Sequence, residues 1–313
     1  MKTLGLDTSN YTTSAAVFDG QSGYNAGKLL EVRPGEKGLR QSDALFQHVK
    51  SLPGRLAELR EAGWLPDVEA VCASTRPRAV EGSYMPCFLA GESLGRSLAE
   101  SLNVPFFAVS HQQGHLAAAA WSAGRMDLLD APFLAWHLSG GTTELLYVEP
   151  DGVNVNARRI GGTTDISAGQ LIDRAGVLLG LSFPAGKAVD ELSRGCSTPV
   201  KPFKVKAKDL EFSLSGMENQ VEGLYARGEE PSVIARFVLD TVSDLICRVT
   251  VEAQNRYPGL PLLCSGGVAS NTRLRYVLTE FCQAIFAQPQ YSTDNAMGAA
   301  ILGCRLGSKD KEE

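Results

Sequence analysis

The sequence predicts an α/β protein with two duplicated lobes, each formed by a mixed sheet flanked by helices. Three observations predict this fold class: two strand–loop–strand segments of the same design start near residues 3 and 133, a buried strand ending in paired glycines follows at residues 262–271, and helical patterns fill the intervals. Together they outline a duplicated nucleotide-binding fold, in which each lobe offers a loop to phosphates. We expect an N-terminal lobe over residues 1–130 and a C-terminal lobe with nucleotide-binding loops over residues 131–313.

The expected elements follow from local patterns. Apolar stretches joined by loops rich in hydroxyl groups or glycine predict paired strands, at residues 3–6 and 14–18, and again at 133–138 and 144–148. Apolar residues at helical spacing predict helices over residues 42–60, 88–102 and 233–253. Pro53 and Gly54 could kink or split the first of these helices, because proline removes a helical hydrogen bond. Asn271 stands where a further helix could begin.

The composition is that of an ordinary globular protein, with 313 residues, 44% of them hydrophobic and 21% charged. The net charge is −5, so binding a polyanion would need a local basic patch or a helper subunit. No apolar run is long enough to span a membrane, and the short apolar start that ends at Asp7 is unlike a signal peptide. Seven scattered cysteines without a Cys-x-x-Cys pair indicate a reducing compartment. We therefore expect a soluble, cytoplasmic protein that does not enter membranes.

His111 and His115 are the strongest candidate metal ligands. On a helix capped by Ser110 they would share one face, one turn apart, close enough to hold one cation. Asp294, in a polar turn between apolar segments, is the best acidic residue to complete the site. The alternative is a solvated or internally hydrogen-bonded histidine pair. A zinc peptidase is disfavoured because Gln112 occupies the position where such an enzyme needs a glutamate base.

The hairpin loop at residues 139–143 is the clearest candidate for a phosphate cradle. Its glycines let backbone N–H groups converge on an anion and its hydroxyls add donors, although an ordinary hairpin turn would use glycine too. Lys204, Lys206 and Lys208 alternate with apolar residues in a basic run at 201–208. An extended chain would show the three ammonium groups on one side. They would either contact a phosphate backbone or guard a solvated edge strand.

These motifs and others resemble, in order and spacing, the TsaD/Gcp family, the catalytic subunit of tRNA threonylcarbamoyladenosine synthesis. The similarity covers nearly the whole chain and is carried by short stretches, each weak alone: residues 5–9, 91–99, 111–115, 139–142, 180–186, 212–216, 266–271 and 292–295. The resemblance implies the actin-like ATPase (ASKHA) fold. It also implies transfer of a threonylcarbamoyl group from threonylcarbamoyl-AMP to N6 of the tRNA adenosine next to the anticodon.

The resemblance implies ligands and partners as well. One divalent metal ion per chain, Fe²⁺ or Zn²⁺, would be bound by His111, His115 and Asp294. The nucleotide, ATP or threonylcarbamoyl-AMP, would be held by residues in and around the glycine loops: Leu138, Ser139, Gly140, Gly141, Thr142, Asp173, Gly186 and Asn271. Asp7 and Ser9 are candidate catalytic residues. The expected partners are tRNA, a smaller homologous TsaB-like subunit and a TsaE-like ATPase.

Near the presumed site the chain departs from the family pattern, mainly by losing acidic residues. The family's His-x-Glu-Gly-His motif has Gln113 here, Gln170 replaces a further acid, and residues 76–78, Arg-Pro-Arg, replace a Gly-Pro-Gly loop. We therefore expect a divergent paralogue. Two other functions stay open. One is a non-catalytic nucleotide-binding scaffold, and the other is an ATP-using small-molecule kinase or carbamoyltransferase, which would need Asp7 or Asp165 as its base.

Overall fold

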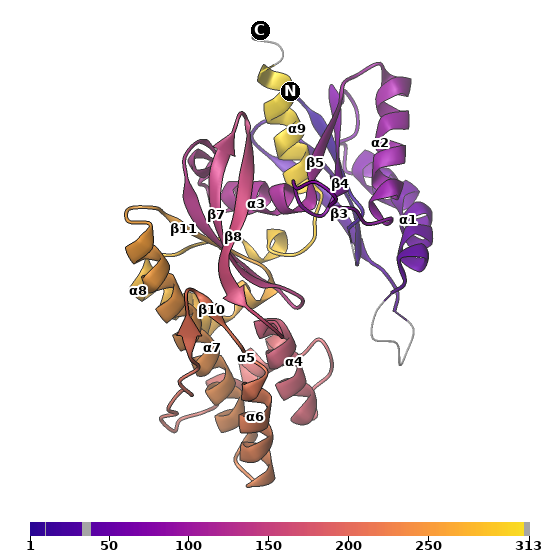
Figure 1. Ribbon diagram of the computed structural model, residues 1–313. Coiled ribbons are helices and arrows are strands. Elements are labelled where there is room, and N and C mark those ends of the chain that lie inside the picture. Colours follow the sequence, from indigo (N-terminus) through magenta and orange to yellow (C-terminus); the bar gives the residue numbers. More distant parts are fainter. Residues whose placement is uncertain (10, 33–38, 310–313) are drawn as a thin grey trace. The chain divides into compact units, whose positions relative to one another are not determined.

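The computed structural model describes residues 1–9, 11–32 and 39–309 (Figure 1). Contacts between residues divide the chain into two compact units. The first unit contains Met1–Ala131, Glu149–Ala157 and the chain from Asp294 onward, and the second contains Pro132–Val148 and Arg158–Thr293. The expected lobes over residues 1–130 and 131–313 stay a prediction.

The first unit is built on a five-stranded mixed sheet. Its strands in chain order are β1 (Thr3–Asp7), β2 (Thr12–Phe18), β3 (Gly23–Leu29), β4 (Ala70–Arg76) and β5 (Phe106–Ser110). They lie side by side in the order β3-β2-β1-β4-β5. Strand β2 is antiparallel to β1 and β3, whereas β1, β4 and β5 run parallel to one another. The predicted hairpin of residues 3–18 is therefore confirmed, apart from residue 10 of its loop, which lies outside the described residues.

Helices cover both faces of this sheet. They are α1 (Gln41–Glu61), α2 (Phe88–Leu102), α3 (His111–Ser122) and α9 (Met297–Lys309), with a short 3-10 helix, η1, at Met126–Asp130. In Figure 1, α1 and α2 lie on one side of the sheet and α3 and α9 on the other. Buried Leu4, Leu6 and Val71 of the sheet pack against α1 and α2, and removing these side chains from water stabilises the unit.

The second unit repeats this arrangement in a seven-stranded mixed sheet. Its strands are β6 (Phe133–Leu138), β7 (Thr143–Asp151), β8 (Asn154–Thr163), β9 (Ala207–Lys208), β10 (Glu211–Phe212), β11 (Leu262–Ser265) and β12 (Ile285–Phe286). The adjoining ends of β7 and β8, within Glu149–Ala157, belong to the first unit. They lie in the order β12-β11-β6-β7-β8-β10-β9. From β8 to β12 this repeats the order of the first sheet, with β6 and β7 antiparallel and β6, β11 and β12 parallel. The predicted duplicated α/β fold is confirmed.

The core of the second unit lies around one long helix, α7. The helices of this unit are α4 (Ala168–Leu178), α5 (Gly186–Arg194), α6 (Gly216–Ala226), α7 (Pro231–Arg256) and α8 (Thr272–Cys282), with 3-10 helices η2 (Gly267–Ser270) and η3 (Pro289–Tyr291). Helix α7 packs against α4, α5, α6 and α8, and its buried Val238, Val242 and Leu245 belong to the same apolar core as the sheet. The indole of fully buried Trp136 donates a hydrogen bond to Thr250 Oγ1 (2.8 Å).

Several local predictions are confirmed and one is corrected. The helix predicted over residues 88–102 has those bounds, whereas Pro53 lies inside α1 without splitting it. Asn271 caps α8: its side-chain oxygen accepts hydrogen bonds from the backbone N–H groups of Arg273 and Leu274, both at 3.0 Å. Among the described helices, none combines the length and the apolar character that crossing a membrane would require.

Candidate functional site

A capping box fixes where α3 begins, directly after β5. The hydroxyl of Ser110 accepts a hydrogen bond from the Gln113 backbone N–H (3.2 Å), and the Gln113 side chain accepts one from the Ser110 N–H (2.8 Å). These bonds satisfy N–H groups that the start of a helix would otherwise leave without partners. Because the helix starts at His111, His115 lies one turn further along the same face. The predicted cap and helix are confirmed.

Close packing between α3 and α9, both in the first unit, brings Asp294 to the histidines. A Cβ on Gly298 of α9 would collide with the backbone of Gly114, the residue directly before His115, so only glycine permits this approach. The chain just before α9 is also tied to the sheet, because the Ala296 N–H donates to Ser14 Oγ (2.9 Å). Asp294 is therefore placed by backbone contacts on both sides of the helix start.

The three predicted ligands lie together. His111 Nε2 is 2.9 Å from His115 Nε2, and Asp294 Oδ1 is 3.5 Å from the former and 3.3 Å from the latter. The side chains are largely buried, with 19%, 8% and 29% of their surface exposed for His111, His115 and Asp294. Ligands that bind one ion at about 2.05 Å lie about 2.9 Å apart at a right angle and about 3.3 Å apart at the tetrahedral angle. The observed separations therefore suit three ligands on one face of a metal ion.

Asp7, at the end of β1, orients His111. One carboxylate oxygen lies 2.8 Å from His111 Nδ1, and the other accepts a hydrogen bond from the Ser9 N–H (3.0 Å). Burial raises the pKa of Asp7, but the charge and the hydrogen bond of His111 outweigh it, so this pKa is lowered and the carboxylate is ionised. Since an ionised carboxylate only accepts, His111 Nδ1 carries the proton and Nε2 faces the other two ligands.

The charges around His111 favour a cation. Burial lowers the pKa of His111, but the carboxylates of Asp7 and Asp294 outweigh burial and raise this pKa to about 10. Burial likewise raises the pKa of Asp294, but His111 and His115 hold it well below its ordinary value. Two ionised carboxylates thus surround two imidazoles. A divalent ion would replace the proton on His111 Nε2, while Nδ1 keeps its proton, because a histidine binds metal only in its neutral form.

The predicted phosphate loop joins β6 and β7 in the second unit. Its ends are closed by two hydrogen bonds, from the Ser139 N–H to the Thr142 carbonyl (2.8 Å) and from the Thr142 N–H to Ser139 Oγ (3.0 Å). Gly140 and Gly141 form the tip, where an added Cβ would meet open space. Within the described chain no protein group accepts a hydrogen bond from the N–H groups of these two glycines. The tip can therefore offer two donors to an anion.

Two other segments of the second unit hold this loop in place. Gly266, with a φ of +97°, passes so close to Leu138 that a Cβ would overlap its backbone. At the start of α4, a Cβ on Gly169 would lie 2.5 Å from Gly140 Cα, and the Ser167 hydroxyl donates to the Gly140 carbonyl (2.6 Å). The glycine turn after β11 and the first turn of α4 therefore support the loop from both sides.

Asp173, Gly186 and Asn271 are linked through α5. Asp173 Oδ1 accepts a hydrogen bond from the Ala185 N–H (2.7 Å), directly before Gly186 begins the helix. Burial raises the pKa of Asp173 by more than the N–H groups of Ala185 and Gly186 lower it. One turn into α5, Asp190 accepts a hydrogen bond from Asn271 Nδ2 (3.0 Å). The predicted nucleotide residues outside the loop are thus one connected group.

Asp190 is the residue of this group that sequence reasoning missed. Asp190 is buried, with 6% of the residue exposed, and besides Asn271 it accepts a hydrogen bond from Thr272 Oγ1 (2.8 Å). Its position four residues after Gly186, on the same face of a helix, was the available signal. Asp190 ties α5 to the start of α8 and so sets the position of Asn271.

Asp165, the second candidate base for a kinase, is fully engaged in local structure. It accepts hydrogen bonds from the Leu214 N–H (2.8 Å) and from the hydroxyl of Ser213. Burial raises the pKa of Asp165, but these hydrogen bonds and those from Ser215 outweigh it and lower the pKa. A carboxylate with a lowered pKa is a poor proton acceptor. Asp7 has a lowered pKa as well.

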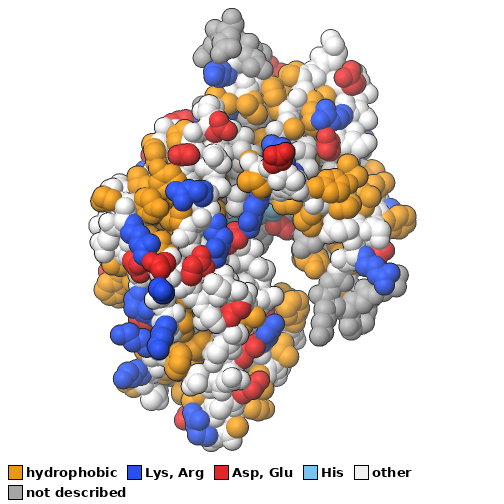
Figure 2. All heavy atoms as spheres, in the orientation of Figure 1, with side chains coloured by type: hydrophobic (Ala, Val, Ile, Leu, Met, Phe, Trp, Pro, Cys, Tyr) orange, Lys and Arg blue, Asp and Glu red, His pale blue; other side chains and the backbone are white. Residues whose placement is uncertain are grey.

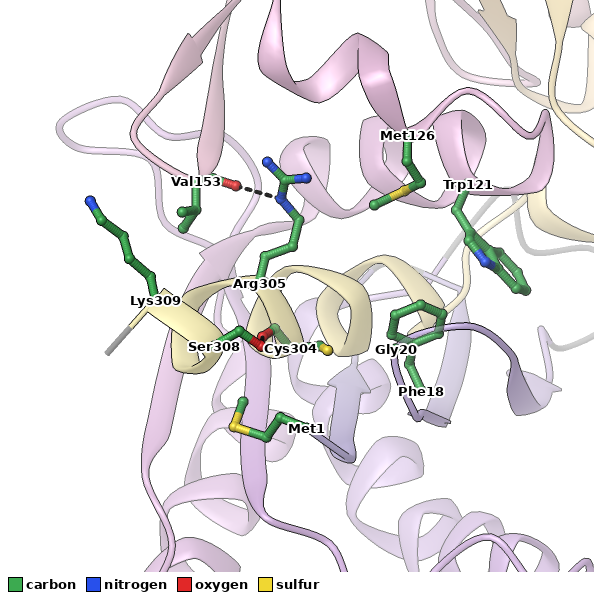
Figure 3. A pocket seen from close by; sticks show the side chains of 10 residues that line it. All are labelled: Met1, Phe18, Gly20, Trp121, Met126, Val153, Cys304, Arg305, Ser308 and Lys309. Carbon is green, nitrogen blue, oxygen red and sulfur yellow. Dashed lines mark hydrogen bonds between the residues drawn. The ribbon is translucent and has the colours of Figure 1, made fainter. Parts of the chain in front are cut away.

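A pocket of about 590 Å³ in the first unit contains none of these residues. It is lined by mostly apolar side chains: Met1, Phe18, Gly20, Trp121, Met126, Val153, Cys304, Arg305, Ser308 and Lys309 (Figure 3). Figure 3 shows the Arg305 side chain reaching Val153, whose carbonyl accepts a hydrogen bond from Arg305 Nε (2.9 Å). Neither the histidine–aspartate group of the first unit nor the glycine loop of the second unit lines this pocket.

Comparison with known proteins identifies the family. A family model described as TsaD, tRNA N6-adenosine threonylcarbamoyltransferase, matches residues 38–301. The chain belongs to this family. It is 31% identical to a tRNA N6-adenosine threonylcarbamoyltransferase of Granulibacter bethesdensis over 329 aligned residues, which cover 96% of this chain and 87% of the relative. The predicted family, that of an acyltransferase acting in tRNA processing, is confirmed.

Solved structures of distant proteins share the fold. Component A of (R)-2-hydroxyglutaryl-CoA dehydratase from Acidaminococcus fermentans is similar to this chain, with a TM-score of 0.58 and 16% identity. The alignment covers 98% of this chain and 99% of component A. Full-length HypF in a phosphate- and nucleotide-bound form is similar with a TM-score of 0.61 and 15% identity, over 100% of this chain and 56% of HypF. At these identities the likeness shows the fold alone. It confirms the predicted actin-like ATPase fold.

Proposed function

We propose that this chain transfers the threonylcarbamoyl group from threonylcarbamoyl-AMP to N6 of the adenosine next to the anticodon of tRNA. Membership of the TsaD family supports this activity. The observation that carries it is the convergence of His111, His115 and Asp294, whose ligand atoms all lie within 4.8 Å of one another. In the reaction, N6 forms a bond to the carbamoyl carbon and loses a proton, the bond from that carbon to the phosphate oxygen breaks, and AMP leaves.

His111, His115 and Asp294 would hold one divalent ion, Fe²⁺ or Zn²⁺. Two imidazole nitrogens and one carboxylate oxygen suit either ion. A bound ion of this kind supplies Lewis-acid polarisation of a phosphate or carbamoyl oxygen. Asp7 keeps the proton on His111 Nδ1, so that the opposite nitrogen offers its lone pair. Asp7 is thus in place to position His111 as a metal ligand. A direct role of Asp7 or Ser9 in catalysis stays a prediction.

The glycine loop would bind the phosphate of threonylcarbamoyl-AMP. Support comes from the N–H groups of Gly140 and Gly141, which point to no acceptor within the described chain and have open space beside them. Gly186 also has open space where a Cβ would be, so a ligand could approach the start of α5 closely. We propose that Asp173 and Asn271, joined to α5 by hydrogen bonds, complete the nucleotide site.

The two alternatives fit the chain less well. A kinase would need a carboxylate base, and both candidates, Asp7 and Asp165, have lowered pKa values and are held by hydrogen bonds. A non-catalytic scaffold would have no use for three assembled metal ligands. A smaller TsaB-like subunit and a TsaE-like ATPase are the partners we propose for the transferase, and the cytoplasm is the proposed compartment.

Metal content and product formation test the proposal. Purified wild-type protein should carry about one Fe²⁺ or Zn²⁺ per chain, and His111→Ala should carry none. His137→Ala is the control for metal content, because His137 lies on β6 in the second unit, outside the ligand group. With threonylcarbamoyl-AMP, unmodified tRNA and the partner proteins, only metal-binding variants should form the modified adenosine, detected by mass spectrometry of digested tRNA.

Three results would contradict the proposal. A wild-type chain that carries the metal and its partners yet leaves tRNA unmodified would exclude the transferase. ATP turnover without tRNA would instead favour the small-molecule kinase. If His111→Ala binds metal as well as His137→Ala does, the three ligands do not form the metal site.

A further inference from the structure

Four lysines lie in a short segment of the second unit, at Lys201, Lys204, Lys206 and Lys208, which we call the lysine strip. All four side chains are exposed, whereas Val205 between them is 6% exposed. The alternation of exposed lysine and buried valine shows that the segment packs one side against the core and turns its ammonium groups outward. Lys204, Lys206 and Lys208 are thus all exposed, and the predicted display of their ammonium groups on one side stays a prediction.

Hydrogen bonds fix this segment although most of it has no regular secondary structure. The Phe203 N–H donates to Thr241 Oγ1 of α7 (2.9 Å), and Arg248 of α7 donates to the Val205 carbonyl (2.9 Å). The segment then enters β9, the edge strand of the sheet, which pairs with β10. Successive lysines two residues apart lie at most about 7 Å apart along the chain. The Cα atoms of Lys204, Lys206 and Lys208 therefore lie within about 14 Å of one another.

The lysine strip is an uncompensated positive charge on an acidic protein. Three acidic side chains of neighbouring segments are paired with arginines instead: Arg248–Asp244 at 2.8 Å, Arg159–Glu211 at 2.6 Å and Arg256–Asp209 at 3.5 Å. Within the described chain, no carboxylate forms an ion pair with any of the four lysines. Figure 2 shows Lys and Arg side chains gathered along the left margin of the second unit.

We propose that the lysine strip binds the phosphate backbone of tRNA; this inference rests on the proposed function. A chain with a net charge of −5 repels a polyanion on average, so productive contact needs a place where positive charge is concentrated. The lysine strip places several positive charges in a line along the chain. A nucleic acid backbone places negative charges in a line as well, with one phosphate charge per about 1.7 Å of duplex axis. Phe203, 39% exposed among the lysines, adds an aromatic surface on which an unpaired base can stack.

The test compares two triple variants that lose the same charge. Lys204→Ala/Lys206→Ala/Lys208→Ala removes the strip, and Lys28→Ala/Lys50→Ala/Arg60→Ala removes three exposed cations of the first unit. Binding of unmodified tRNA to the purified full chain is measured by fluorescence anisotropy between 50 and 200 mM salt. The strip variant should bind about tenfold to a hundredfold more weakly at 100 mM salt, and the slope of log K against log salt should fall by about 2–3. The control and a Lys→Arg triple variant of the strip should bind like wild type.

The outcomes separate this inference from the proposed function. Equal loss of binding in both alanine variants, or no loss in the strip variant, would overturn the strip as the tRNA contact, and so would a wild-type chain without measurable tRNA binding. Binding to vesicles containing anionic phospholipid that depends on the strip, with tRNA binding unchanged, would assign it to a lipid surface instead. Strip-dependent tRNA binding by a chain that forms no modified adenosine would support the strip and count against the transferase.

Discussion

Replacing Gly298 by alanine should separate the metal ligands without touching any of them. The α3–α9 contact is backbone against backbone at this point, since a Cβ on Gly298 would collide with the carbonyl of Gly114. Gly114 stands between His111 and His115, and Asp294 lies four residues before Gly298. The added methyl group must therefore push apart the two segments that carry the ligands.

The expected magnitude follows from two opposing contributions. Alanine is favoured over glycine inside a helix by about 1 kcal/mol, whereas overpacking that displaces backbone costs about 1–3 kcal/mol. Gly307→Ala is the matched control: it lies in the same helix, and its Cβ would meet chiefly the flexible end of the Met1 side chain. Relative to that control, Gly298→Ala should lower the free energy of unfolding by about 1–3 kcal/mol. Metal affinity should fall about 10–100-fold, as it does when the support of a ligand is lost.

The assay pairs urea unfolding with competition for Zn²⁺ against a fluorescent chelator, both on purified full-length protein. Wild type and Gly307→Ala should bind Zn²⁺ alike, and Gly298→Ala should bind more weakly. If Gly298→Ala keeps wild-type affinity while its stability falls, the α3–α9 approach does not set the ligand geometry. If neither the Zn²⁺ affinity nor the free energy of unfolding changes, the backbones of Gly114 and Gly298 are not in close contact.

Three further outcomes are expected. Gln113→Glu should lower the free energy of unfolding by about 1–3 kcal/mol, because a carboxylate cannot donate to the Val155 carbonyl as the amide does (2.8 Å); an unchanged urea midpoint would contradict this. Thr250→Val should cost about 1–3 kcal/mol by leaving the buried Trp136 indole without its acceptor, and Thr250→Ser, which keeps the hydroxyl, should cost less. The pKa of Asp165 is lowered in the folded protein, so its contribution to stability is present above the unfolded pKa of about 4 and is lost as pH falls below it. Asp165→Asn should therefore weaken the fall in unfolding free energy between pH 5 and pH 3, and an unaltered pH dependence would refute the assignment.

Elements with a strong local pattern could be predicted from the sequence. The helix over residues 88–102 has the predicted bounds, because apolar residues recur at helical spacing along its whole length and no proline interrupts it. Ser110 and Asn271 were identified as helix starts because a cap depends on a single side chain and its nearest N–H groups. Pro53 could have kinked or split its helix, but α1 continues through it. Residues on both sides of the proline pack into the core, and this packing compensates for the lost hydrogen bond.

Features set by contacts distant in sequence could not be predicted in this way. The choice of Asp294 followed from its polar setting, but the reason it reaches His111 is the contact between Gly114 and Gly298, residues that no local pattern connects. Asp190 was missed for the same reason, since its partners Asn271 and Thr272 lie about 80 residues further along the chain. Motifs identify the kinds of residue a site needs, whereas the glycines and carboxylates that position them emerge only when the chain is folded.

The predicted loss of acidic residues near the candidate site does not make the group of three metal-ligand candidates neutral. Gln113 is the residue predicted to replace an acid of the family pattern. Its side-chain amide is used at both ends: the oxygen accepts a hydrogen bond from the Ser110 N–H, and the nitrogen donates one to the Val155 carbonyl. A glutamate could accept in the same way but could not donate, so the amide here supports the fold around α3. The negative charge that a divalent ion requires is still supplied by Asp7 and Asp294, both with lowered pKa values. Gln113 therefore contributes to how the start of α3 is held, and the negative charge of the ligand group rests on Asp7 and Asp294.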